Sequence, residues 1–268
     1  ARAAAKAGRL DDAARLLLEQ MVARVADDAD QLVDFVAGIA VVGLGHCHPA
    51  PLAAAAAQLE QLWHVSNLYW TVPMTTLAAR LSDRFGGAEA FFCNSGAEAV
   101  EAALKYARKA TGKPGVVALH GSFHGRTLGS LSATGQPAKR AAFEPLLPVT
   151  FTAPNDEDAL AAAVSDETGC ILLEPILGEG GVVPLEPRFL AAARRLADES
   201  GALLVLDEVQ AGVGRTGTFF AFEQLGVRPD LLTLAKALAN GLPIGALLVA
   251  DDASETRQSP RDLTHEGD

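Results

Sequence analysis

Cysteine, aromatic residues and positive charge are all scarce in this sequence. Its 268 residues include 3 cysteines and 6% aromatics, and 33 acidic residues outnumber 22 lysines and arginines. Cys47, Cys93 and Cys170 lie singly and far apart, a spacing that indicates neither a disulfide framework nor a Cys-x-x-Cys metal site. The net charge of -11 argues against a nucleic-acid or anionic-membrane partner, because either would require a basic patch. No apolar run approaches the roughly 20 residues of a membrane span, so we expect a cytoplasmic protein with a small-molecule ligand.

Hydrophobic residues make up 49% of the chain, enough for a substantial core. From about residue 90, short apolar runs alternate with Ala-rich stretches of helical period, a pattern typical of repeated βαβ units. The predicted strands cover 90–93, 115–119, 149–151, 170–173, 202–206, 231–234 and 246–249, and the predicted helices cover 97–111, 156–164 and 187–200. Several strands are apolar throughout, which indicates an α/β fold with a mostly parallel sheet and helices on both faces.

Two strand ends carry residues of opposite charge, Asp207 and Lys236. In open α/β sheets, ligands bind outside the carboxyl ends of the strands, so both side chains are candidates for chemistry. A pyridoxal-phosphate (PLP) enzyme needs such a pair, because a lysine forms a Schiff base with the cofactor and an acid keeps the pyridine nitrogen protonated. Taken alone, an aspartate and a lysine at strand ends are more often a solvated ion pair.

The third strand end, Ser95-Gly96-Ala97, runs directly into a predicted helix. Ser95 is a suitable N-cap, and Gly96 allows a ligand or a neighbouring chain to approach the backbone closely. Free amides and the helix dipole favour an anion at this position, such as a phosphate group. In most proteins, however, a Ser-Gly helix start is only a cap.

The fourth strand end begins the loop 120–127, which contains Phe123 and Arg126. Phe123 could stack on a ring, and the planar guanidinium of Arg126 could bind a carboxylate. His120 and His124 could share a zinc ion only on a helix, and the glycines of the loop oppose one, so we expect no metal site here. The His-Cys-His sequence at 46–48 lacks further ligands nearby and is interpreted as a structural loop.

Six motifs, in their order and spacing, resemble signatures of the class III, or ornithine-type, PLP-dependent aminotransferases. They lie at 43–49, 94–99, 123–126, 174–181, 207–210 and 235–238. The stretches 62–69, 134–137 and 143–146 are most similar to the acetylornithine aminotransferases of that family. No Gly-x-x-x-x-Gly-Lys or Gly-x-Gly-x-x-Gly motif in register supports the alternative of a nucleotide-binding α/β protein.

The resemblance implies a PLP enzyme of fold type I that forms a homodimer. Its implied reaction moves the terminal amino group of N2-acetylornithine to 2-oxoglutarate in arginine biosynthesis. Ornithine or 4-aminobutyrate as amino donor, and a catalytically impaired or inactive fragment, are the alternatives.

The resemblance also assigns a role to each matching residue. Lys236 would carry the cofactor and transfer the proton, and Asp207 would pair with the pyridinium. Arg126 would bind the substrate carboxylate, and Glu179 would neutralise a second arginine that relatives carry in a later domain. The implied cofactor-binding residues are Ser95, Gly96, Ala97, Phe123, Asp207, Glu208, Val209, Gln210 and Lys236.

By the same resemblance, the chain divides into an N-terminal helical segment (1–40), a PLP-binding large domain (41–251) and a divergent tail (252–268). We expect the small C-terminal domain of the family to be absent, together with its arginine and with the threonine that a partner subunit supplies to the cofactor phosphate. The spacing of Leu10, Ala14, Leu17 and Met21 predicts a peripheral helix in the first segment.

Overall fold

The computed structural model describes residues 34–255. The helix expected within 1–30 and residues 256–268 of the predicted tail (252–268) lie outside the described residues. Among the described residues, 38–255 belong to one compact unit. No helix in the described range is long and apolar enough to cross a membrane.

A seven-stranded sheet forms the centre of this unit, with the strand order β1-β9-β8-β7-β4-β2-β3. The strands are β1 (Ala88–Cys93), β2 (Gly115–Leu119), β3 (Thr150–Thr152), β4 (Thr168–Leu173), β7 (Leu203–Asp207), β8 (Leu231–Leu234) and β9 (Gly245–Ala250). Every neighbouring pair is parallel except the two pairs that β9 makes with β1 and β8. All seven predicted strands are therefore present, and the predicted mostly parallel sheet is confirmed.

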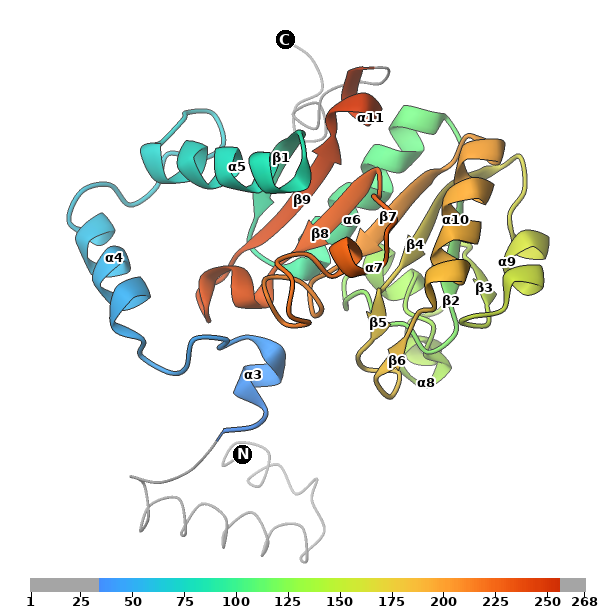
Figure 1. The fold of residues 1–268 in the computed structure, drawn as a ribbon, viewed down its shortest axis with the longest axis horizontal. Coiled ribbons are helices and arrows are strands. Elements are labelled where there is room, and N and C mark those ends of the chain that lie inside the picture. The colour runs from blue at the N-terminus through green and yellow to red at the C-terminus, as the bar shows by residue number, and fades with distance from the viewer. Residues whose placement is uncertain (1–33, 256–268) are drawn as a thin grey trace, which may run out of the picture. The chain divides into compact units, whose positions relative to one another are not determined.

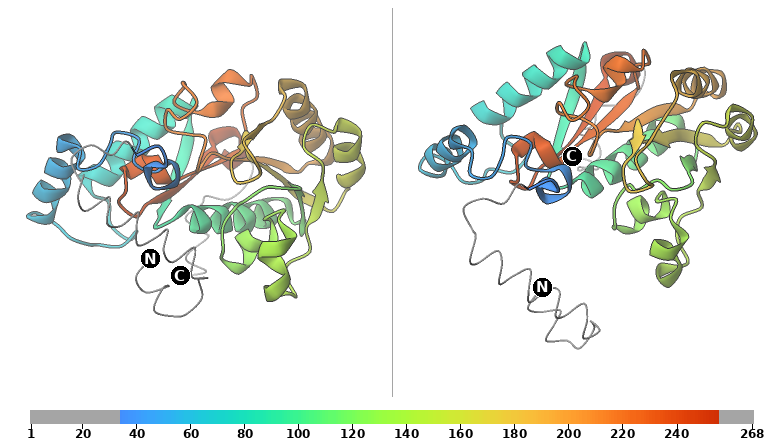
Figure 2. Two further views of the ribbon diagram at one scale, coloured as in Figure 1. Left: turned by 90° about the horizontal axis from the view of Figure 1, so that it is seen from below. Right: turned by 60° about the horizontal axis from the view of Figure 1, so that its bottom comes forward.

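Helices cover both faces of this sheet (Figure 2), as the apolar strands predicted. The helix α6 (Gly96–Thr111) packs on one face, and α5 (Val72–Phe85), α9 (Glu157–Ala163) and α10 (Pro187–Ser200) pack on the other. The sequence sets the bounds of α10 directly, because proline occupies its first turn and Gly201 ends it in a left-handed conformation with φ of 67°. Every residue of β4, β7, β8 and β9 is buried between the two helical layers.

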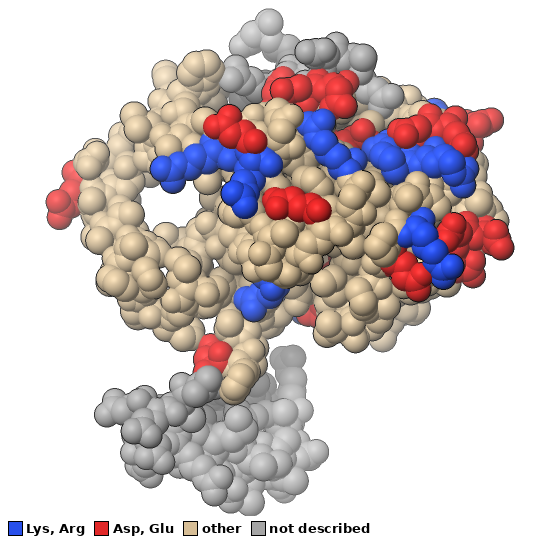
Figure 3. Space-filling view, viewed as in Figure 1, with Lys and Arg blue, Asp and Glu red and all other residues tan. Residues whose placement is uncertain are grey.

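The remaining elements are short or lie outside the sheet. They are α3 (Ala37–Ala40), α4 (Pro49–Leu59), α7 (Leu128–Ser132), α8 (Pro137–Arg140), α11 (Asp251–Glu255), the β5 (Ile176–Leu177) and β6 (Val183–Pro184) hairpin, and the 3₁₀ turns η1 (Ala141–Phe143), η2 (Ala221–Gln224) and η3 (Lys236–Ala239). In Figure 1, the chain from α4 to the start of α5 stands away from the sheet. Figure 3 shows an opening between this segment and the rest of the unit, and few charged side chains on the segment in this view.

Candidate active site

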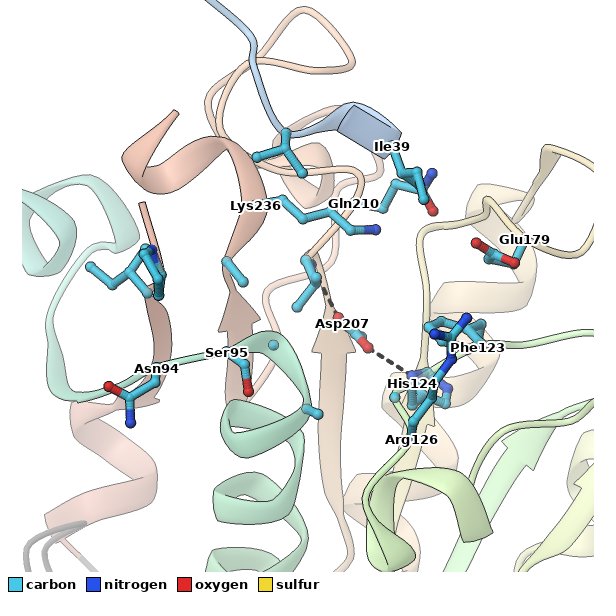
Figure 4. A pocket seen from close by; sticks show the side chains of 18 of the residues that line it. Ile39, Asn94, Ser95, Phe123, His124, Arg126, Glu179, Asp207, Gln210 and Lys236 are labelled. Atoms are coloured by element: carbon cyan, nitrogen blue, oxygen red, sulfur yellow. Dashed lines mark hydrogen bonds and ion pairs between the residues drawn. The ribbon is translucent and has the colours of Figure 1, made fainter. Parts of the chain in front are cut away.

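The carboxyl ends of the parallel strands border a cavity of about 470 Å³. Ser95 follows β1, Glu174 follows β4 and Lys236 follows β8, while Asp207 is the last residue of β7. All four line the cavity, and Figure 4 shows Lys236 and Asp207 pointing into it from adjacent strands. The sheet order therefore brings together the charged pair that the sequence separates by 29 positions.

Asp207 is buried and its carboxylate has three hydrogen-bond donors. His124 Nδ1 lies 2.7 Å from Asp207 Oδ2, while Thr233 Oγ1 and the Val209 amide each donate to Oδ1 at 3.0 Å. Burial opposes the charged imidazole, but the hydrogen bond and the charge of Asp207 raise the pKa of His124 above its usual value. His124 and Asp207 therefore form a buried hydrogen-bonded pair at the base of the cavity, and the raised pKa favours the protonated imidazole.

Glu174 is the second buried carboxylate at this edge of the sheet. Its Oε1 accepts a hydrogen bond from the Phe123 amide at 2.8 Å, and its charge interacts with those of His124 and Asp207. Burial is the main cause that raises the pKa of Glu174 to about 7. From the sequence, neither Glu174 nor His124 had an assigned role beyond its place in a family motif, apart from the zinc alternative considered for His124.

Lys236 occupies the strained start of η3, with φ of 43° in the left-handed region. Such a conformation costs a non-glycine residue roughly 1 kcal/mol or more and is concentrated at functional sites. Burial lowers the pKa of the Lys236 amine, which increases the fraction of the neutral, nucleophilic form. The nearby charges of Asp207, Glu174 and Glu179 oppose that effect.

The N-terminus of α6 forms one wall of the cavity. Ser95 Oγ accepts a hydrogen bond from the Glu98 amide at 3.2 Å, so it caps the helix as the sequence predicted. The amides of Gly96 and Ala97 precede the first intrahelical hydrogen bonds and remain available to an anion. A side chain at position 96 would place its Cβ 2.8 Å from Val209 Cγ1, so only glycine allows Val209 to lie this close.

Phe123, Arg126 and Glu179 lie at one side of the cavity (Figure 4). The Arg126 guanidinium lies 5.8 Å from the centre of the Phe123 ring, and Lys139 Nζ lies 4.5 Å from the same point. Lys139 Nζ also donates a hydrogen bond to Glu179 Oε2 at 2.9 Å. Glu179 therefore has a cationic partner within this chain, which the sequence did not suggest.

Gln210 lines the cavity, whereas Glu208 is not among its lining residues in the part of the chain that the structure describes. The buried Glu208 carboxylate accepts hydrogen bonds from the Ala221 and Phe222 amides, both at 2.7 Å. Glu208 was expected to contact the cofactor. The structure places it instead as a support for the η2 turn, because consecutive side chains after a strand point in different directions.

His120 and His124 have different neighbours. The His120 ring stacks on Phe151, with ring centres 5.7 Å apart, while His124 faces Asp207. No group of three or more metal-ligating side chains occurs within residues 34–255.

An apolar wall, which sequence reasoning missed, includes Ile39, Val41, Leu242 and Ile244. The wall combines the segments 39–41 and 242–244. The Asn240 side chain links the chain near these two segments, because it accepts a hydrogen bond from the Leu44 amide at 2.9 Å and donates one to the Gly45 carbonyl at 3.1 Å. No local sequence signal could reveal a contact across about 195 residues.

Comparison with known proteins matches residues 18–266 to the aminotransferase class III family. The chain belongs to the class III aminotransferases. It is 50% identical over 223 residues to the acetylornithine aminotransferase of Halalkalibacterium halodurans and 54% identical over 228 residues to that of Mycolicibacterium smegmatis. These matches cover 83% and 84% of the chain but 58% of each relative, so the chain spans just over half of their length.

Solved structures agree with this assignment. The N-acetylornithine aminotransferase of Stenotrophomonas maltophilia matches with a TM-score of 0.72 and 42% identity, covering 85% of this chain and 59% of that one. The ornithine aminotransferase of Toxoplasma gondii matches with a TM-score of 0.79 and 31% identity, covering 87% and 57%. The fold is thus that of fold-type-I PLP enzymes, and class III aminotransferases depend on PLP.

The cavity has the groups that PLP requires. It combines a lysine of lowered pKa, a buried carboxylate fixed by His124, free amides at a helix start and an aromatic side chain in Phe123. The lysine matches the aldehyde of PLP, and the carboxylate matches its pyridine nitrogen. The amides match its phosphate, and Phe123 matches one face of its ring. The donor set therefore fits the cofactor.

Proposed function

We propose that the chain carries the PLP site of an ω-amino-group aminotransferase, with N2-acetylornithine as donor and 2-oxoglutarate as acceptor, as in arginine biosynthesis. The observation that carries this proposal is the convergence of Lys236, Asp207 and the α6 amides on one cavity. The donor rests on the relatives at 50% and 54% identity, whose name is acetylornithine aminotransferase, and the acceptor rests on the family resemblance of the sequence motifs. Such a biosynthetic role implies a cytoplasmic location, which cell fractionation would test.

Lys236 has two roles in this proposal. Its amine would hold the cofactor covalently, and once an incoming amine has displaced it, the same amine would act as the base and acid that moves the substrate proton. PLP, when bound, supplies an electron sink for the carbon that loses the proton. The lowered pKa of Lys236 increases the fraction of neutral amine, the form that can accept a proton.

Asp207 would bind the pyridine nitrogen and keep it protonated. The His124 contact at 2.7 Å stabilises the carboxylate form, which this role requires. The amides of Gly96 and Ala97 would bind the phosphate, and Gln210 would reach the ring hydroxyl. Phe123 and Val209 would lie against opposite faces of the ring, consistent with their place in the cavity wall. Arg126, a planar cation at the rim, would bind the substrate carboxylate.

A panel of amino donors tests the substrate assignment. With 2-oxoglutarate fixed as acceptor, N2-acetylornithine should give the highest kcat/KM, above ornithine and 4-aminobutyrate. Arg126→Gln should raise KM for the preferred donor, since it removes the carboxylate partner. A higher kcat/KM for ornithine would assign the chain to the ornithine branch, and no turnover of any donor by PLP-loaded chain would favour the catalytically impaired alternative.

We also propose that the chain forms a homodimer through the segment from α4 to α5. Large apolar side chains along it are exposed, including Trp63 at 83% and Trp70 at 70%, with Leu52, Leu59, Leu68 and Tyr69. Apolar surface of this extent is typical of an interface between protein chains. Sedimentation should show a dimer that Trp63→Ser with Trp70→Ser dissociates, while Leu128→Ser, an exposed apolar control on α7, has no effect. A monomeric wild type would contradict this proposal.

A further inference from the structure

The Glu179 carboxylate lies among three cations at the rim of the cavity. Its hydrogen bond with Lys139 is the main cause that lowers its pKa, and the charges of Lys236 and Arg126 lower it further. The Lys139 and Glu179 side chains are partly exposed, at 33% and 31%. Within the described part of the chain, the Arg126 guanidinium makes no hydrogen bond or ion pair, and it lies 5.8 Å from the centre of the Phe123 ring.

The position of Lys139 depends on the same loop that carries Phe123 and Arg126. Lys139 belongs to α8, and the preceding Gln136 donates from Nε2 to the carbonyls of Gly121 and Ser122, both at 3.2 Å. The next residue, Arg140, faces elsewhere, since it pairs with Glu144 and lies over the Phe151 ring. Of these two neighbouring cations, only Lys139 therefore reaches Glu179.

We infer that Lys139 is a positioning residue that keeps Glu179 paired and so leaves Arg126 free to bind a substrate carboxylate. The inference rests on the proposed function, in which Arg126 is the carboxylate anchor. An arginine offers a carboxylate a planar, two-point hydrogen-bonding partner, which is a stronger match than a lysine. Without Lys139, Glu179 would turn to Arg126 and compete with the substrate for it.

This arrangement concerns specificity rather than bond breaking. While Lys139 pairs with Glu179, a carboxylate-bearing substrate can bind Arg126 without first displacing the Glu179 carboxylate. A substrate with a protonated amine at the same place would meet Glu179, whose charge Lys139 partly offsets. Lys139 thereby adjusts how the rim discriminates between carboxylate-bearing and amine-bearing substrates.

Binding of glutarate, a dicarboxylate that cannot react, tests the inference on the 268-residue chain. Calorimetry would measure its Kd with and without PLP for Lys139→Gln, Lys139→Arg, Glu179→Gln and the Lys139→Gln/Glu179→Gln double variant. Arg195→Gln is the matched control, because it removes an exposed cation from α10, where Arg195 pairs with Glu199. NMR would follow the Glu179 carboxyl group as a function of pH.

We expect Lys139→Gln to raise Kd about tenfold, which corresponds to about 1.4 kcal/mol. Lys139→Arg and the Arg195 control should stay within about twofold of wild type. The double variant should regain the Kd of Glu179→Gln, because the competitor of Arg126 is gone. In Lys139→Gln, the pKa of Glu179 should rise toward its ordinary value.

Two results would overturn the inference. If the double variant binds glutarate as weakly as Lys139→Gln, Lys139 contacts the ligand itself; if Lys139→Gln binds like wild type, Lys139 has no part in recognition. Either result leaves the proposed function intact, provided that Arg126→Gln weakens binding and PLP attaches to Lys236. If Arg126→Gln leaves Kd unchanged, the carboxylate site of the proposed function fails and this inference fails with it.

Discussion

Replacement of His124 tests the electrostatic basis of the site most sharply. His124→Phe keeps an aromatic ring in the core but removes the donor that lies 2.7 Å from Asp207. The two side chains are 0% and 4% exposed, so the carboxylate would remain buried without its cation. Breaking a buried pair in this way typically costs about 3–5 kcal/mol, and we expect about 3 kcal/mol because Thr233 and the Val209 amide still donate to Asp207.

Urea unfolding followed by circular dichroism would measure this loss at pH 7. His124→Asn, which can keep a neutral donor near the Nδ1 position, should lose less than His124→Phe. Adding Asp207→Asn to His124→Phe should recover part of the loss, because the uncompensated charge is removed. A loss below about 1 kcal/mol for His124→Phe, or no recovery in the double variant, would refute the buried-pair account.

The pH dependence of this contribution has a defined sign. Because the pKa of folded His124 is raised, the stabilisation is fully present below the unfolded pKa of about 6.5 and is lost as the pH rises through the folded pKa. The difference in stability between wild type and His124→Asn should therefore narrow from pH 6.5 toward alkaline pH. A difference that widens over this range would contradict an imidazolium at position 124.

Three further predictions concern the same cavity. Asp207→Asn should keep the fold, judged by circular dichroism, and lose about a hundredfold or more in transamination rate. Gly96→Ala should destabilise the chain by about 1–3 kcal/mol and weaken PLP binding, since the new Cβ would lie 2.8 Å from Val209; thermal unfolding with and without PLP measures both. Because the pKa of Glu174 is raised to about 7, the free energy of unfolding of the wild type should fall as the pH rises from about 4.5 through 7. In urea unfolding at a series of pH values, Glu174→Gln should lack this fall.

The sheet could be predicted because its strands have distinct apolar runs. The runs 115–119 and 231–234 coincide with β2 and β8, and the predicted helix 187–200 coincides with α10, where proline and glycine mark both ends. The helix α4 (Pro49–Leu59) was not predicted because its sequence is almost wholly apolar and has no polar face to give a period. The β5 and β6 strands, of two residues each, are too short for any period.

The site was predictable only in part, for a reason of topology. Strand ends identified Ser95, Asp207 and Lys236 as candidates, because polar residues directly after apolar strands are visible in the sequence. The contact between His124 and Asp207 spans 83 positions and exists because the loop after β2 turns toward the end of β7. The ion pair of Lys139 and Glu179 likewise joins an exposed helix to a loop, and no spacing rule relates the two.

The most direct test of the central claim is the site of covalent PLP attachment. Purified chain would be incubated with PLP, treated with borohydride to fix the bond and analysed by peptide mass spectrometry. We expect the cofactor on Lys236 and its loss in Lys236→Ala, with weaker labelling in Asp207→Asn. Cofactor attached mainly to another lysine, or equal labelling of the Lys236→Ala variant, would contradict this expectation.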